Sequence, residues 1–114
     1  MANILKNIAQ SEILNLKDCV AYADGQVVSK TLIQNDGVGI TIFAFAKGEG
    51  ISTHESKGDA LVTSLDGVGK ITIAGKDFVL NAGESIVMPA NTPHAVFGQE
   101  NFKMLLVVTF PPQN

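Results

Sequence analysis

The sequence of 114 residues contains one cysteine, no tryptophan and only two histidines. Because Cys19 has no second cysteine to pair with, the chain forms no internal disulfide, and nothing in it indicates an oxidising compartment. A zinc site built from several thiolates is excluded for the same reason. The lack of tryptophan removes one common sugar-stacking residue without excluding sugars as ligands. Imidazole chemistry is restricted to His54 and His94.

Long apolar runs and clusters of like charge are also missing. The apolar run over residues 104–108 has the length of a strand, and no run approaches a membrane span. The N-terminus lacks the apolar stretch of a signal peptide, so we expect a cytoplasmic protein. The net charge is −3 and the basic residues are scattered singly. We therefore expect neither nucleic acid nor membrane as a partner.

Turn-forming residues divide the chain into short strands. With 46% hydrophobic residues, the chain is expected to fold as one domain. Asn35-Asp36-Gly37 is the strongest turn signal, because these residues tolerate the positive φ of a tight hairpin. It follows a strand expected over 26–34 and precedes an alternating run over 38–47. Both faces of that run are largely apolar, which predicts burial on both sides.

Further strands are expected over 60–65, 70–74, 77–80, 85–88, 94–97 and 102–110. Residues 4–16 mix apolar and polar side chains without a clean period, and we interpret them as a short edge strand or a helical turn. No segment longer than ten residues carries a convincing helical period. Many short strands with such turns predict an all-β fold, an antiparallel sandwich or barrel.

Two segments place a histidine at a set distance after a glycine on this pattern of strands and turns. The residues concerned are Gly48, His54 and Gly67 in the first segment and Gly83, Pro89 and His94 in the second. In this combination the chain resembles the cupin superfamily, the small double-stranded β-helix, or jelly-roll, barrels. Asn91 stands where the family's second motif usually has glycine.

The resemblance covers roughly residues 38 to 108 and implies a single RmlC-like barrel of two antiparallel sheets over residues 1–114. We expect residues 38–108 to form the barrel core and residues 1–34 to form N-terminal edge strands or a dimer arm. The family commonly pairs barrels through edge strands, which implies a homodimer to which residues 1–34 contribute.

The chain departs from the family's metal motif at two positions. Ser56 stands where a second histidine is usual, and Ala60, or Leu61 at the longer spacing, stands where a glutamate is usual. The resemblance then leaves two metal ligands, His54 and His94, whereas a catalytic metal normally needs three from the protein. The cofactor is therefore open, and we expect divalent metal to bind weakly or not at all.

Two carboxylates lie close enough in sequence to be considered as replacements. Asp59 would supply a ligand if its strand entered with a bulge, but in regular alternation it points away from the barrel interior. Glu55 follows His54 directly, so in an extended segment the two side chains face opposite ways. Neither residue restores the missing ligands in a regular strand.

The leading hypothesis is a small-molecule-binding barrel with an apolar pocket, with His54 and His94 at its polar end. If the protein is an enzyme, the resemblance and the residues favour metal-free acid–base chemistry of the isomerase, epimerase or lyase type. His54 would act as base, His94 as a second proton carrier or hydrogen-bond donor, and Ser56 as a polar contact. The expected ligand-binding residues are Ser56, Val62, Met88, Phe43 and Met104. The expected core residues are Phe43, Phe45, Val62, Met88, Val96, Met104 and Leu106.

Two other hypotheses remain open. One is a metal-dependent enzyme of the oxygenase type, in which His54 and His94 hold the metal and Asp59 or waters complete its shell. The other is a non-catalytic regulatory or structural barrel, in which both histidines merely satisfy hydrogen bonds at the barrel mouth.

Overall fold

Seven strands and one short 3₁₀ turn, Leu16–Asp18, form the regular structure of residues 3–112, the part of the chain that this computed structural model describes. The strands are β1 (Val27–Gln34), β2 (Val38–Phe45), β3 (Gly50–His54), β4 (Asp59–Ile73), β5 (Lys76–Asn81), β6 (Ser85–Met88) and β7 (His94–Thr109). All their pairings are antiparallel. Among the described residues, no helix is long and apolar enough to cross a membrane.

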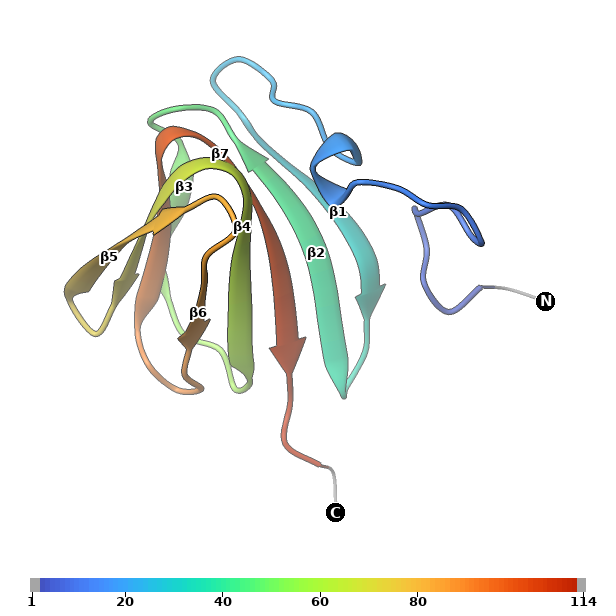
Figure 1. The fold of residues 1–114 in the computed structure, drawn as a ribbon. Coiled ribbons are helices and arrows are strands. Elements are labelled where there is room, and N and C mark those ends of the chain that lie inside the picture. Colours follow the sequence, from blue (N-terminus) through green and yellow to red (C-terminus); the bar gives the residue numbers. More distant parts are fainter. Residues whose placement is uncertain (1–2, 113–114) are drawn as a thin grey trace.

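The two long strands, β4 and β7, pair with each other and run through both layers of a barrel (Figure 1). The second half of β7 pairs with β2 and with the first half of β4, and β1 and β6 complete this layer. The first half of β7 pairs with β3 and with the second half of β4, and β5 completes the other layer. The predicted all-β, jelly-roll architecture of two antiparallel sheets is confirmed.

The predicted breaks inside these long strands are wrong. Separate strands were predicted over 60–65 and 70–74 and over 94–97 and 102–110, but β4 and β7 continue through the residues between them. The register between them shifts on both sides of Gly67, whose φ is +73°. The turn-forming residues are therefore used as bulges, which bend a strand from one layer to the next without ending it.

The N-terminal segment explains why both faces of β2 are apolar. Residues 3–26 contain no strand, so the edge-strand alternative for residues 4–16 is wrong. A short 3₁₀ turn begins at the end of that range, at Leu16–Asp18. Val20 from this segment packs against Ile42 and Ala44 on the outer face of β2. Phe45, on the opposite face, belongs to the barrel core. Each face of β2 is therefore covered by a different part of the chain. Figure 1 shows the N-terminal segment beside β1, on the side away from β5 and β6.

A side-chain contact attaches the same segment to β4 and β7. The Tyr22 hydroxyl donates a hydrogen bond of 2.6 Å to the Asp66 carboxylate, and the Lys103 ammonium lies 4.9 Å from the centre of the Tyr22 ring. Burial, together with the Asp66 carboxylate, raises the pKa of Tyr22 above its usual value. The N-terminal segment is thus held to the barrel by polar contacts as well as by apolar packing.

The barrel core agrees with the sequence-based expectation. Phe45, Val62, Met88, Val96 and Met104 are buried together. The two other expected members, Phe43 and Leu106, are half-buried and pack against this cluster. Alternation along strands identified these inward-facing residues because successive side chains point to opposite faces.

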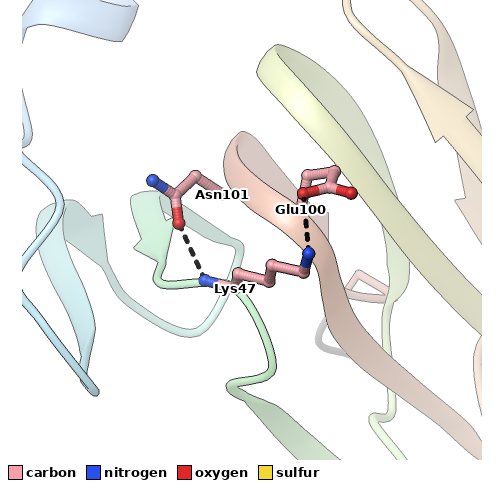
Figure 2. Close-up of polar contacts among 3 residues, drawn as sticks. All are labelled: Lys47, Glu100 and Asn101. Carbon is pink, nitrogen blue, oxygen red and sulfur yellow. Dashed lines mark hydrogen bonds and ion pairs between the residues drawn. The ribbon is translucent and has the colours of Figure 1, made fainter.

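At the barrel end distant from both histidines, polar contacts join the β2–β3 loop to the bend of β7. The Asn101 side-chain carbonyl accepts a hydrogen bond of 2.8 Å from the Lys47 backbone N–H, and the Lys47 ammonium lies 3.3 Å from a Glu100 oxygen (Figure 2). Both charged side chains are largely exposed, so this ion pair contributes about 0–1 kcal/mol. The histidines lie at the opposite end, where β3 ends and β7 begins.

Candidate functional site

The two histidines are neighbours across a pair of strands. His54 is the last residue of β3, His94 is the first residue of β7, and the two are paired in register after an irregularity that begins at Ile51. Their Nε2 atoms are 3.2 Å apart, and their ring centres are 4.3 Å apart. The fold thus brings together the two residues that the sequence indicated as the polar end of a pocket.

Backbone carbonyls orient both imidazole rings. His54 Nδ1 lies 2.9 Å from the Ser52 carbonyl oxygen, and His94 Nδ1 lies 3.1 Å from the Thr92 carbonyl oxygen. In each case the acceptor is two residues before the histidine. Because a carbonyl only accepts, both Nδ1 atoms must carry a proton for these contacts to be hydrogen bonds.

A count of ring protons shows which protonation state of the histidine pair fits this geometry. Three contacts, two to carbonyls and one between the Nε2 atoms, need three ring protons, whereas two neutral imidazoles carry two. The pair is therefore fully hydrogen-bonded when it holds one additional proton. Burial lowers the pKa of His94, which is 3% exposed, whereas His54 is exposed to solvent. The lowered pKa favours the neutral form of His94, whose Nε2 can then accept a hydrogen bond in the contact between the two rings.

The segment before His94 is held in place by two hydrogen bonds. Asn91 has a φ of +57°, and its N–H donates to the Ser56 carbonyl at 2.7 Å. This left-handed backbone explains why glycine is usual at this point of the cupin motif and why asparagine can replace it. The Asp59 carboxylate accepts a hydrogen bond of 2.8 Å from the Ala90 N–H. Asp59 thus has a structural partner in the loop that leads to His94.

The imidazole pair lines a cavity of about 260 Å³ at this end of the barrel. Most of the lining is apolar and comes from the inner faces of β3, β4, β6 and β7. The polar side chains of the lining are those of Gln34, His54, Ser56 and His94. An apolar cavity with a few convergent polar groups is the usual form of a small-molecule site.

The expected ligand-binding residues are divided by the structure. Ser56, Met88 and Met104 line the cavity together with both histidines. Val62 is fully buried in the core and Phe43 packs against that core, and neither is part of the lining. The strand pattern placed the four apolar residues of this set on inward faces, but it did not show how far each lies from the mouth of the barrel.

The sequence reasoning missed Gln34 and Phe110, which also line the cavity. Gln34 ends β1 next to the Asn35-Asp36-Gly37 turn, and Phe110 follows the last residue of β7. Both positions border strong turn or chain-breaking signals. Their position at the end of a strand is the sequence signal that would have predicted both residues to lie at the barrel mouth.

The donor set offers an incomplete site for a metal. The two imidazoles provide two protein ligands where a catalytic metal normally has three. Within residues 3–112, no cluster of three or more His, Cys, Asp or Glu side chains is placed to hold a metal ion. The Ser56 hydroxyl accepts a hydrogen bond of 3.2 Å from the Gly58 N–H. These residues do not by themselves fit a resident metal, and weak or absent metal binding remains a prediction.

A two-layered antiparallel barrel with a histidine pair at an apolar open end defines a class, the jelly-roll barrels with a ligand cavity at one mouth. A family model described as "Cupin domain" matches residues 41–110, which is more than half of the chain. The chain belongs to the cupin superfamily, as its two histidine motifs indicated.

Solved structures agree with this assignment. A protein of unknown function from Streptococcus pyogenes is 41% identical, with a TM-score of 0.95 and 98% of each chain covered. A cupin superfamily protein from Desulfitobacterium hafniense is 36% identical, with a TM-score of 0.89, covering 94% of this chain and 98% of its own. A cupin 2 conserved barrel domain protein from Leptotrichia buccalis is 49% identical, with a TM-score of 0.83, over 84% of this chain and 47% of its own. No curated protein matches the chain.

Proposed function

We propose that this protein binds a small molecule in the cavity at the open end of the barrel, with the His54–His94 pair as its polar contact and its proton carrier. The observation that carries the proposal is the imidazole pair itself: two rings fixed by carbonyls, 3.2 Å apart, on an otherwise mostly apolar cavity of about 260 Å³. Ser56 adds a hydroxyl group to the same lining.

The pair is equipped for general acid–base catalysis. An Nε2–H held between the two rings can be donated to a ligand, and an unprotonated Nε2 can accept a proton, so the pair offers both an acid and a base. Burial lowers the pKa of His94, which favours its neutral form as the acceptor of a hydrogen bond from His54. An isomerisation, epimerisation or lyase step shifts a proton within the bound ligand. Such a step needs an acid–base group whose pKa is near the working pH, and it needs no metal.

The metal-dependent alternative has one observation in its favour. Because both Nδ1 atoms face carbonyls, the two Nε2 atoms converge on the same point and could ligate one ion together. Against it, Asp59 is engaged by the Ala90 N–H. The third alternative, a regulatory or structural barrel with a vestigial pocket, is less well supported because a cavity is present beside the imidazoles.

A binding screen with matched variants tests the proposal. We expect a metabolite panel to include compounds that raise the unfolding temperature of the unmodified protein, and His54→Ala and His94→Gln to abolish this shift. Glutamine retains a polar side chain at the buried position 94, and circular dichroism verifies the fold. Lys47→Ala, at the other end of the barrel, serves as the control and should leave the shift intact. The site assignment is wrong if neither histidine variant changes any ligand-induced shift.

A further inference from the structure

A second cavity, of about 370 Å³, lies beside the first at the same end of the barrel. It is formed by the β1–β2 turn, the loop before β4 and the C-terminal tail. Gln34 and Phe110 line both cavities. Ser56 lines the inner cavity and the next residue, Lys57, lines the outer one. The wall between the two spaces therefore consists of the Gln34 and Phe110 side chains and the loop that carries Ser56 and Lys57.

Several contacts hold Phe110 in this wall. Its backbone N–H donates a hydrogen bond of 3.1 Å to the Gly37 carbonyl. A Cβ atom on Gly58 would lie 3.0 Å from Phe110 Cδ1, so the ring lies close against the bare backbone of Gly58. Pro111 and Pro112 follow, and their fixed φ angles restrict the tail. The backbone of Phe110 is thus anchored to the β1–β2 turn, and its half-buried ring packs against Gly58.

We infer that Phe110 sets the length of the ligand, because its side chain closes the inner cavity against the outer one. This inference rests on the proposed function. If each nonhydrogen atom takes about the volume of a water molecule in the liquid, about 30 Å³, the inner cavity holds about nine such atoms. The two cavities joined would fall within the roughly 300–1,000 Å³ of sites for larger ligands.

The chemistry of the lining points to a small organic acid as the ligand. Because both Nδ1 atoms contact backbone carbonyls, the Nε2 atoms are the ring atoms left to contact a ligand, and a carboxylate oxygen can accept a hydrogen bond from an Nε2–H in place of the other ring. The remaining lining, which includes Met88 and Met104, suits an apolar body. The outer cavity carries one charge of each sign, Lys57 and Asp36, and so has no net attraction for an anion. The carboxylate is therefore held at the inner cavity.

Binding of straight-chain acids by calorimetry at pH 6 tests the inference, with butanoate, hexanoate and decanoate as probes. For the unmodified protein, we expect hexanoate to bind more tightly than butanoate. Decanoate should bind no more tightly than hexanoate. In Phe110→Ala, butanoate affinity should stay within about twofold. Decanoate should bind at least about tenfold more tightly than to the unmodified protein, since each buried methylene strengthens binding by about fourfold.

Two further variants make the result independent of the stability of Phe110→Ala. Gln34→Ala opens the same wall from an exposed position and should shift the chain-length preference in the same direction. Phe110→Leu keeps a bulky side chain and should therefore keep the limit on the chain length of the bound acid. Equal chain-length dependence in the unmodified protein, Phe110→Ala and Gln34→Ala would overturn the inference and leave the proposed function standing. If butanoate and hexanoate do not bind the unmodified protein, the inference is overturned, and the metabolite panel alone decides the proposed function. Equal binding of these acids to His54→Ala and to the unmodified protein would contradict both.

Discussion

At the scale of single residues, the mouth of the barrel depends on side chains that serve the backbone. The Asp59 carboxylate bonds to the Ala90 N–H, the Ser56 hydroxyl bonds to the Gly58 N–H, and Asn91 adopts a φ of +57°. Together these residues position the loop that ends at His94. A buried imidazole in a fixed orientation has a defined proton acceptor, which is what acid–base chemistry requires.

The ligand count at the histidine pair leads to a prediction about metal affinity. Ser56 and Ala60 line the same cavity as His54 and His94, so larger side chains at these positions can approach both Nε2 atoms. We expect Ser56→His combined with Ala60→Glu to strengthen divalent-metal binding by at least about 100-fold, because two added ligands complete a shell. Calorimetric titration with Mn²⁺ and Zn²⁺, beside elemental analysis, measures the difference.

Ser56→Ala combined with Ala60→Val is the control, because neither new side chain can coordinate. A stoichiometric metal that survives chelator in the unmodified protein would contradict the prediction. It would mean that a carboxylate such as Asp59 or Glu55 turns inward, and the oxygenase hypothesis would then replace the metal-free one.

At the scale of secondary structure, the bends in β4 and β7 join the two layers. Gly67 stands at the register shift with a φ of +73°, in the left-handed region. A Cβ atom at this position would overlap the Asn101 carbonyl oxygen on β7. Glycine is required here both by the backbone angle and by the close approach of the neighbouring strand.

Gly67→Ala should therefore cost at least about 2 kcal/mol in the free energy of unfolding, from left-handed strain and overlap together. Gly75→Ala is a matched control, because Gly75 also has a positive φ, +81°, but nothing lies within 4 Å of a Cβ atom there. It should cost about 1–2 kcal/mol from strain alone. Urea denaturation measures both free energies of unfolding. Equal destabilisation of the two variants would contradict the prediction, because the close approach to Asn101 would then add nothing to the strain.

At the scale of the whole molecule, the N-terminal segment covers part of the outer sheet face and leaves apolar side chains uncovered. Ile13 is fully exposed, Ile4 is 79% exposed, and both belong to this segment. Leu61 and Val87, paired across β4 and β6, are 43% and 50% exposed. Neighbouring apolar side chains on a surface favour association.

The homodimer to which residues 1–34 contribute remains a prediction, which this exposed apolar surface motivates. We expect light scattering to show a dimer at micromolar concentration. Ile4→Asp combined with Ile13→Asp should raise the dissociation constant of this dimer by about tenfold or more. Val79→Asp, which changes a 53% exposed residue on β5, is the control and should leave the dimer intact. A monomeric unmodified protein at that concentration would refute the prediction.

The sequence alone determined the fold class, the family and the identity of the histidine pair. The strand Ser85–Met88 and the turn before Val38 were predicted at their observed places. These features are local, because alternation of side chains and the φ angles that Asn, Asp and Gly tolerate are properties of short segments. The spacing of His54 and His94 within two motifs was also readable without a structure.

Tertiary structure decided the features that depend on register between distant strands. Whether Gly67 ends a strand or bends it depends on how β7 passes beside it. The hydrogen bond from Ala90 to Asp59, and the place of Phe110 between two cavities, arise from segments far apart in sequence. Residues at such positions carry no local periodic signal, because the pairing of strands, and not the pattern within one, sets which side chains meet.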